Sequence, residues 1–298
     1  MRLAAAPRGG PRSPAQGDLA VVGWINTKMY WETGDQVKSQ GWTPLIVDTN
    51  GNGKRDEGYN EPGKPGDPGR DTRIAFGMYG ISWSPLDGSI WGSNLAHPGY
   101  LIRLAPGPNP PETALAELYR IPLPGYGIRG MDIDRNGVVW SPLDSGHIAS
   151  FDRRKCKGPL NGPGAELGNK CPEGWSFFPL PGPSFSSVPG FSVESSYYTW
   201  VDQHDTSGLG ANVPIATGNL FDGLHALVAG KFVTLRIPYP LGFYAKGLDG
   251  RIDDAKAGWK GRGLWVTSGD RTPWLKEGGK GTKPLVVHFQ VRPDPLAD

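Results

Sequence analysis

The sequence has few cysteines, few methionines and no long apolar run. Its 298 residues include two cysteines and four methionines. No stretch approaches the roughly 20 apolar residues of a transmembrane helix, so no membrane span is expected. The sequence also lacks a Gly-x-Ser-x-Gly elbow, a phosphate-binding loop, a dinucleotide fingerprint and a His-Glu-x-x-His motif. Serine hydrolase, nucleotide-binding and zinc-protease functions are therefore unsupported.

The sequence also has little excess of positive over negative charge. The formal net charge is +2, and residues 1–18 hold Arg2, Arg8 and Arg12 against Asp18. The rest of the chain is close to neutral and has no basic stripe. We therefore expect neither nucleic acid nor an anionic membrane surface as a partner.

The first 18 residues lack the apolar core of an export signal. Four apolar residues follow Arg2, whereas a signal peptide needs 7–15. We expect residues 1–18 to be a disordered leader, or a start placed at an unnatural point in the chain.

Glycine, proline and aromatic residues are abundant. There are 45 glycines and 30 prolines, a composition that would suggest low complexity if aromatic residues were scarce. However, 11 tryptophans, 10 tyrosines and 10 phenylalanines are spread along the chain and can form a core. Glycine and proline are therefore interpreted as turn residues between many short strands. No convincing helical period extends beyond about two turns, so we expect an all-β fold.

An internal repeat supports this fold class. Residues 79–93 are echoed by residues 129–141, and in each copy an alternating strand runs into Asp87-Gly88 or Asn136-Gly137. Such pairs predict type I′ hairpin turns, in which both central residues have positive φ. Trp91 and Trp140 follow at the same distance, 49 positions apart (91 to 140).

Each copy continues with two further strand-like segments, so the repeat unit is a four-stranded antiparallel sheet. Such a unit cannot bury both faces alone and must stack on its neighbours. We predict a β-propeller with about five blades, in the ranges 19–71, 72–124, 125–183, 190–240 and 241–298. The ring is either small and irregular or lacks N-terminal blades. Open blade edges would favour self-association.

The repeat resembles that of the streptogramin (virginiamycin B) lyase-like propellers. The resemblance rests on the Asn/Asp-Gly-x-x-Trp hairpin, the Gly-x-Ile-x-x-Phe-Asp strand and the Tyr/Phe-x-x-Pro-Leu-Pro edge. Residues 72–298 are similar to the C-terminal part of largely uncharacterised bacterial exported members of that group. The resemblance implies a propeller fold and does not specify a function.

The resemblance also suggests where chemistry would occur. In the streptogramin lyases, histidines and a glutamate act with magnesium at the central funnel, and a histidine commonly precedes the innermost strand. Here the corresponding positions offer Tyr79, Arg129, Tyr197 or Tyr198, and Lys246. The two clearest blades carry Tyr79 and Arg129 in place of the histidine, which puts lyase chemistry in doubt.

The two cysteines lie in a stretch rich in glycine, proline and asparagine. A disulfide between Cys156 and Cys171 would close a loop of about 15 residues, worth about 3 kcal/mol in the chain-entropy model. It would also indicate an oxidising compartment, periplasmic or extracellular. Two unrelated free thiols are the alternative.

A short acidic and amide-rich motif predicts a cation site. Oxygen-bearing side chains alternate along residues 48–57 around a glycine, as in calcium loops. A structural Ca²⁺ would be bound by Asp48, Asn50, Asn52, Asp56, the Lys54 carbonyl and Glu57. A solvated turn is the alternative.

Two histidines are candidates for a functional site. His204 lies between Asp202 and Asp205, and a carboxylate beside an imidazole could orient it as a general base. His225 follows Asp-Gly-Leu and is a candidate ligand-binding residue, together with Tyr198 and Lys246.

Two functions remain open at this point. The first is a non-catalytic exported module that binds a small molecule, a saccharide or another exported protein. The second is a lyase or lactonase-like enzyme with Mg²⁺ at the funnel, for which the candidate catalytic residues are His204, Asp202, Arg129 and Tyr79.

Overall fold

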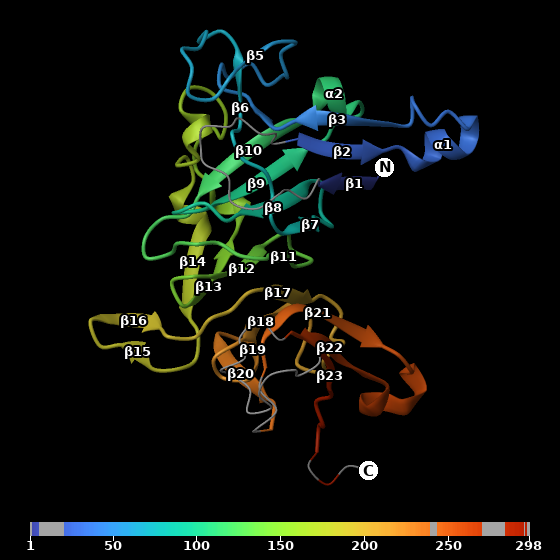
Figure 1. Cartoon of the computed structure of the whole chain (residues 1–298), viewed down its shortest axis with the longest axis vertical. Coiled ribbons are helices and arrows are strands. Elements are labelled where there is room, and N and C mark those ends of the chain that lie inside the picture. Colours follow the sequence, from blue (N-terminus) through green and yellow to red (C-terminus); the bar gives the residue numbers. More distant parts are fainter. Residues whose placement is uncertain (1, 6–20, 239–242, 270–283, 295, 297–298) are drawn as a thin grey trace. The chain divides into compact units, whose positions relative to one another are not determined.

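The chain is an all-β protein. The computed structural model describes residues 2–5, 21–238, 243–269, 284–294 and 296. Strands dominate these residues and build several antiparallel sheets (Figure 1), which confirms the prediction of an all-β propeller built from four-stranded blades. No helix in the described ranges is long and apolar enough to cross a membrane.

The chain divides into two compact units. Unit 1 comprises Met1–Pro122 and Arg153–Gly174, and unit 2 comprises Leu123–Asp152 and Trp175–Asp298.

A three-stranded antiparallel sheet opens unit 1. It consists of β1 (Arg2–Ala5), β2 (Val21–Ile25) and β3 (Gln40–Pro44), and the short helix α1 (Thr27–Thr33) connects β2 to β3. The expectation of a disordered leader is wrong for residues 2–5, because β1 pairs with β2. The rest of the expected leader lies outside the described residues.

The second sheet of unit 1 has seven strands in the order β5-β6-β4-β10-β9-β8-β7. Its strands are β4 (Ile46–Val47), β5 (Tyr59–Asn60), β6 (Asp71–Arg73), β7 (Ile81–Trp83), β8 (Ile90–Asn94), β9 (Tyr100–Ala105) and β10 (Leu115–Arg120), with the helical turn α2 (Pro110–Thr113) before β10. The strands β7 to β10 form the predicted antiparallel blade. The expected first blade, 19–71, is not one sheet, because the short buried strand β4 pairs with β10 rather than with β3.

Unit 2 contains two four-stranded sheets, a three-stranded sheet and a hairpin among its described residues. Its strands are β11 (Asp132–Ile133), β12 (Val139–Leu143), β13 (His147–Phe151), β14 (Trp175–Pro179), β15 (Ser184–Phe185), β16 (Val188–Ser192), β17 (Thr199–Asp202), β18 (Val213–Gly218), β19 (Gly223–Val228), β20 (Lys231–Arg236), β21 (Ala245–Ile252), β22 (Arg262–Ser268) and β23 (Leu285–Phe289). Each sheet runs in chain order, which is the topology expected of a blade.

The repeated hairpins have a different turn from the predicted one. Gly88 and Gly137 have φ values of 70° and 76°, but the residues before them do not have positive φ. The turns are longer than type I′, and an aspartate closes each. In the second hairpin, the Asp134 carboxylate accepts hydrogen bonds from the backbone N–H groups of residues 136 and 138 and from the indole N–H of Trp140. In the first hairpin, the indole N–H of Trp91 donates to the Ser89 hydroxyl, and this hydroxyl donates to the Asp87 carboxylate. Each tryptophan therefore anchors the turn that precedes it.

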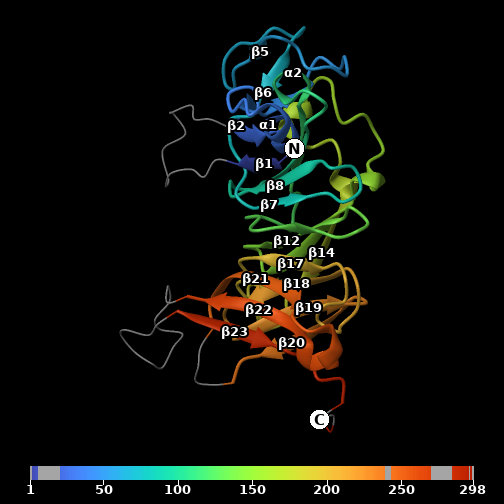
Figure 2. The same cartoon turned by 90° about the vertical axis from the view of Figure 1, so that its right-hand side faces the viewer.

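The sheets of unit 2 bury their apolar faces against one another (Figure 2). The sheet β17–β20 lies between the sheets β11–β14 and β21–β23, since β17 and β18 contact both β12 and β21. On β18, Ile215 packs with Leu264 and Val266, whereas the adjacent Ala216 packs with Ile148. All six residues of β18 are buried, as expected for a strand covered on both faces.

A buried polar pair crosses the same core. His225 on β19 and Glu194 are both almost fully buried, and the His225 Nε2 lies 2.9 Å from the Glu194 carboxylate. The other carboxylate oxygen accepts the N–H groups of Ser195 and Leu220, and the His225 Nδ1 is hydrogen-bonded to Thr234. The pair therefore joins the segment before β17 to the middle of the sheet.

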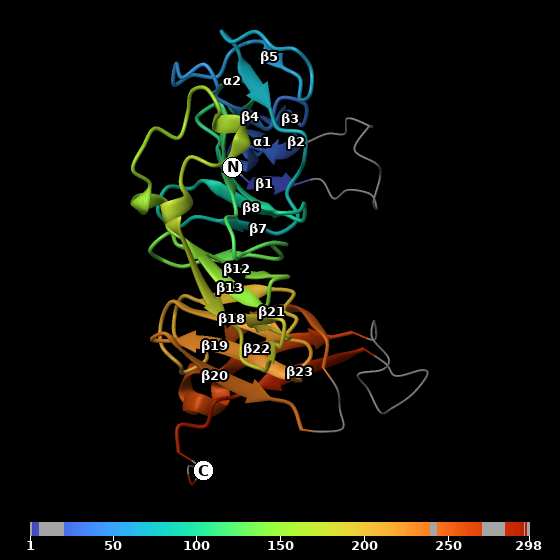
Figure 3. The ribbon, with the colours of Figure 1, turned by 90° about the vertical axis from the view of Figure 1, so that its left-hand side faces the viewer.

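Residues 153–174 form an excursion that belongs to unit 1, drawn in yellow-green in Figure 3. It contains the 3₁₀ turns η1 (Arg153–Lys155), η2 (Ala165–Leu167) and η3 (Pro172–Gly174). The predicted disulfide between Cys156 and Cys171 is confirmed. Backbone hydrogen bonds join Gly162 to Asp48 and Arg120 to Gly168, so the excursion is held to β10 and to the loop after β4.

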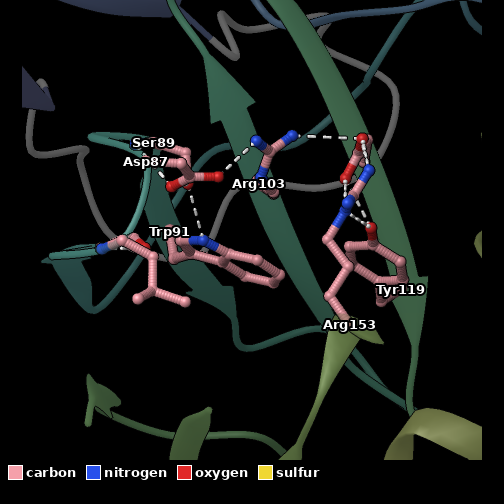
Figure 4. A network of polar contacts seen from close by, with 9 residues as sticks. Asp87, Ser89, Trp91, Arg103, Tyr119 and Arg153 are labelled. Atoms are coloured by element: carbon pink, nitrogen blue, oxygen red, sulfur yellow. Dashed lines mark hydrogen bonds and ion pairs between the residues drawn. The ribbon is translucent and has the colours of Figure 1, made fainter. Parts of the chain in front are cut away.

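A charged network holds the excursion to the blade (Figure 4). The carboxylate of Glu117 on β10 accepts hydrogen bonds from Arg153 at 2.6 and 2.7 Å and lies 3.1 Å from a guanidinium nitrogen of Arg103. Arg103 also pairs with Asp87, and Tyr119 donates to Glu117. Burial raises the pKa of Glu117, but the hydrogen bond from Arg153 and the charge of Arg103 outweigh it, so its pKa lies below its ordinary value of 4.5.

The lowered pKa of Glu117 predicts an acid-sensitive unit 1. A carboxylate with a depressed folded-state pKa stabilises the fold above its unfolded pKa, and that stabilisation is lost as the pH falls through the folded pKa. We expect Glu117→Gln to cost about 2–3 kcal/mol at neutral pH, because Arg153 loses its carboxylate partner and Arg103 loses one of its two. In urea unfolding below pH 4.5, the variant should lose less stability than the wild type. If the unfolding free energies of the variant and the wild type change in parallel with pH, this role of Glu117 is contradicted.

The buried pair in unit 2 gives a second prediction. Glu194→Ala would leave buried N–H donors without an acceptor, and we expect a loss of about 3–5 kcal/mol in unfolding free energy. Glu194→Gln keeps an acceptor and should cost less. The same truncation at the exposed Asp249 serves as the control and should stay within about 0.5 kcal/mol of the wild type. Equal effects at positions 194 and 249 would contradict the interpretation.

Candidate functional site

Two cations from different sheets of unit 2 lie over one tyrosine ring. The Arg129 guanidinium carbon is 4.9 Å, and the Lys246 ammonium 4.4 Å, from the centre of the Tyr197 ring. Arg129 precedes β11, Tyr197 precedes β17 and Lys246 lies at the start of β21. The sequence-based interpretation had placed these residues at the starts of innermost strands, and the structure brings these three together. We call Arg129, Tyr197 and Lys246 the cation–tyrosine cluster.

Backbone pairing between adjacent sheets builds the cluster. Gly130 exchanges hydrogen bonds with the backbone of Tyr197 and Thr199, so the segments before β11 and β17 run side by side. Asn219 exchanges hydrogen bonds with the backbone of Ala245, next to Lys246. The main chain beside Arg129 and Tyr197 is thus held by backbone pairing between sheets, and the main chain beside Lys246 by the side-chain amide of Asn219.

Two neighbouring groups complete the surroundings of the cluster. Asp144, which follows β12, accepts a 2.7 Å hydrogen bond from Arg129. The Tyr244 ring lies 6.2 Å from the Tyr197 ring. Sequence reasoning did not find either residue, since neither belongs to the repeat motif. The surroundings of the cluster therefore include a carboxylate and a second tyrosine ring.

Tyr198, the predicted ligand-binding residue, has a packing role. A Cβ at Gly130 would lie 2.1 Å from the Tyr198 ring, so the ring fits only because residue 130 is glycine. The Tyr198 ring also stacks on the Tyr197 ring, with 5.9 Å between the ring centres, so it supports the ring over which the cations lie. Tyr79 lies just before β7 in unit 1, where its N–H donates to the Ser93 carbonyl.

The proposed pairing of His204 with Asp202 does not form. Asp202 is fully buried, and its carboxylate accepts the N–H groups of Thr206 and Ser207 at 2.8 and 2.7 Å as well as the Ser207 hydroxyl. It accepts the backbone N–H of His204, not the ring. The prediction of a catalytic pair is corrected: Asp202 closes the loop after β17, and the His204 side chain is exposed.

His225 is also corrected as a ligand-binding candidate. Its side chain is about 1% exposed, and both ring nitrogens are hydrogen-bonded within the core. It presents no surface to a ligand. A histidine that alternates with apolar residues in a central strand is more simply a core residue.

The loop predicted to bind calcium folds tightly in unit 1. Asp48 accepts the N–H groups of Gly51 and Gly53, and the amide groups of Asn50 and Asn52 donate to the Asp56 carboxylate. Lys54 and Glu57 are exposed. Within the part of the chain that the structure describes, no three Asp, Glu, His or Cys side chains form a cluster able to hold a metal ion.

A cavity of about 470 Å³ lies beside this loop in unit 1. The disulfide excursion forms one wall with Cys156, Leu160 and Asn161, while Glu117 and Asp48 lie on the others. Two charged groups of its lining, Glu117 and Arg153, are paired with each other. This pairing explains the cavity wall as part of the attachment of the excursion.

Comparison with known proteins gives structural likeness without sequence relatives. No family model matches the chain, and no curated protein matches its sequence. Virginiamycin B lyase from Staphylococcus aureus has a TM-score of 0.44 at 15% identity, over 76% of this chain and 61% of that one. A protein of unknown function from Bacteroides caccae has a TM-score of 0.44 at 13% identity, over 76% and 69%.

PorZ, a surface component of the type-IX secretion system of Porphyromonas gingivalis, has a TM-score of 0.43 at 14% identity, over 74% of this chain and 26% of PorZ. The chain thus spans about three fifths of the lyase and about a quarter of PorZ. No residue role follows from similarities of this size.

Proposed function

We propose that unit 2 is a binding module of an exported propeller protein, and that it recognises an acidic saccharide at the cation–tyrosine cluster. The single observation that carries this proposal is the placement of Arg129 and Lys246 over one tyrosine ring. Cation–π contacts hold both cationic groups in place, which lowers the entropy lost when they bind an anion.

Charge favours an anionic ligand. Asp144 pairs with Arg129, while Lys246 brings a second positive charge to the Tyr197 ring. Lys246 has no ion-pair partner within the described ranges and is half-buried. Its ammonium group is therefore the group that a ligand carboxylate would engage.

The aromatic groups favour a saccharide. Tyr197 and Tyr244 place aromatic rings beside the cations, and amphipathic rings of this kind pack against the C–H face of a sugar. The disulfide supports an exported location, since disulfides persist in oxidising compartments. The alternative, a lyase or lactonase-like enzyme, would instead require the bound ligand to be cleaved at the cation–tyrosine cluster.

We expect calorimetric titration with oligogalacturonate to show binding that weakens as salt is raised, because exposed charge pairs are screened. Neutral maltooligosaccharides should bind at least about tenfold more weakly. Ligand breakdown during the titration, followed by chromatography, would instead favour the enzyme alternative. No binding of either probe would contradict the proposal.

Lys246→Met should weaken oligogalacturonate binding by about tenfold or more, since it removes the unpaired cation while keeping the length of the side chain. Lys231→Met, at an exposed position on β20, is the matched control and should bind as the wild type does. Equal affinities for the two variants would refute the role of Lys246.

A further inference from the structure

Three consecutive sheets of unit 2 place a side chain at the same position, shortly before the first strand of the sheet. In each sheet, a hydroxyl group on the second strand is hydrogen-bonded to the backbone of that residue. The residues are Arg129, Tyr197 and Tyr244, and the hydroxyl groups are those of Ser141, Thr217 and Ser268. Because the sheet β17–β20 is the middle one, Arg129 and Tyr244 approach the Tyr197 ring from the two neighbouring sheets.

The main chain that carries Tyr244 is held on both sides. The Tyr244 N–H donates to the Ser268 hydroxyl at 3.1 Å, and the Tyr244 carbonyl accepts the N–H of Gly269 at 2.9 Å. The next residue, Ala245, is fully buried, whereas Tyr244 itself is half-buried. A partly accessible ring on a fixed main chain loses little freedom when a ligand packs against it.

The strand β21 is irregular at Lys246. Ala245 pairs with Ser268 and Gly247 pairs with Thr267, so Lys246 is an extra residue in the register of β21 against β22. A bulge of this kind redirects a side chain and is common beside functional sites. The Lys246 ammonium lies over the Tyr197 ring, two residues along the chain from Tyr244.

The two tyrosine rings offer different surfaces. The Tyr197 ring is already in contact with two cations and with the Tyr198 ring. The Tyr244 ring lies 6.2 Å away and is inclined by 59° to the Tyr197 ring. A sugar ring packs with one face against an aromatic ring, so a single sugar cannot lie flat against two rings that are inclined in this way. The Tyr244 ring therefore suits a second sugar.

We propose that the cation–tyrosine cluster and Tyr244 form two adjacent subsites, so that the ligand is a disaccharide or a longer acidic chain rather than a single sugar. This inference rests on the proposed function. One sugar residue places its carboxylate at the Lys246 ammonium, and the neighbouring residue packs against the Tyr244 ring. The second contact adds to the affinity because the molecule has already lost its translational freedom at the first.

The test is calorimetric titration of the full chain with galacturonate and with digalacturonate. We expect digalacturonate to bind at least about tenfold more tightly than galacturonate. Equal affinities would overturn the second subsite while leaving the proposed function in place. If neither these sugars nor the longer oligogalacturonate binds, the proposed function fails, and this inference fails with it.

Tyr244→Ala should remove most of the gain of digalacturonate over galacturonate and leave the affinity for galacturonate close to that of the wild type. Tyr244→Phe keeps the ring and should keep the gain. Tyr30→Ala, at an exposed tyrosine on α1, is the matched control and should bind both sugars as the wild type does.

Two results with Tyr244→Ala would overturn the assignment of Tyr244 to a second subsite. One is an undiminished gain for digalacturonate, and the other is an equal loss of affinity for both sugars. If this variant does not fold, Tyr244→Leu, which keeps apolar bulk without a flat ring, takes its place, and loss of the gain is required.

Discussion

The structure depends on one constraint: a sheet that is apolar on both faces must be covered on both faces. The strand β18 is buried along its whole length, with Ile215 toward one neighbouring sheet and Ala216 toward the other. Each buried aliphatic side chain contributes about 1.5–3 kcal/mol, and this contribution is lost if a neighbouring sheet is absent. Stacking of sheets is therefore the condition for folding, and the positions of the inner strand ends follow from it.

Polar side chains inside the stack satisfy backbone groups that stacking buries. Asp202 closes a loop, and Glu194 satisfies His225 and two backbone donors. The Asp132 carboxylate accepts the Val201 N–H of the next sheet at 2.8 Å. Asp202, a catalytic candidate in the sequence, therefore satisfies buried backbone groups, in line with the rule that buried polar groups are hydrogen-bonded.

The candidate site arises where the ends of strands from adjacent sheets meet. At the cation–tyrosine cluster, Arg129 and Lys246 lie over the Tyr197 ring, and Asp144 accepts a hydrogen bond from Arg129. Lys246 has no ion-pair partner among the described residues, and its positive charge is a physical reason to expect an anionic ligand.

Local patterns in the sequence were sufficient for the strands, the blade repeat and the disulfide. Alternation, turn glycines and the spacing of Trp91 and Trp140 depend on neighbours along the chain, and so does the loop closed by Cys156 and Cys171. The turn type, the use of β4, the choice between Tyr197 and Tyr198 and the burial of His225 could not be read in this way. They depend on which sheet lies next to which, and that is set by packing between residues far apart in sequence.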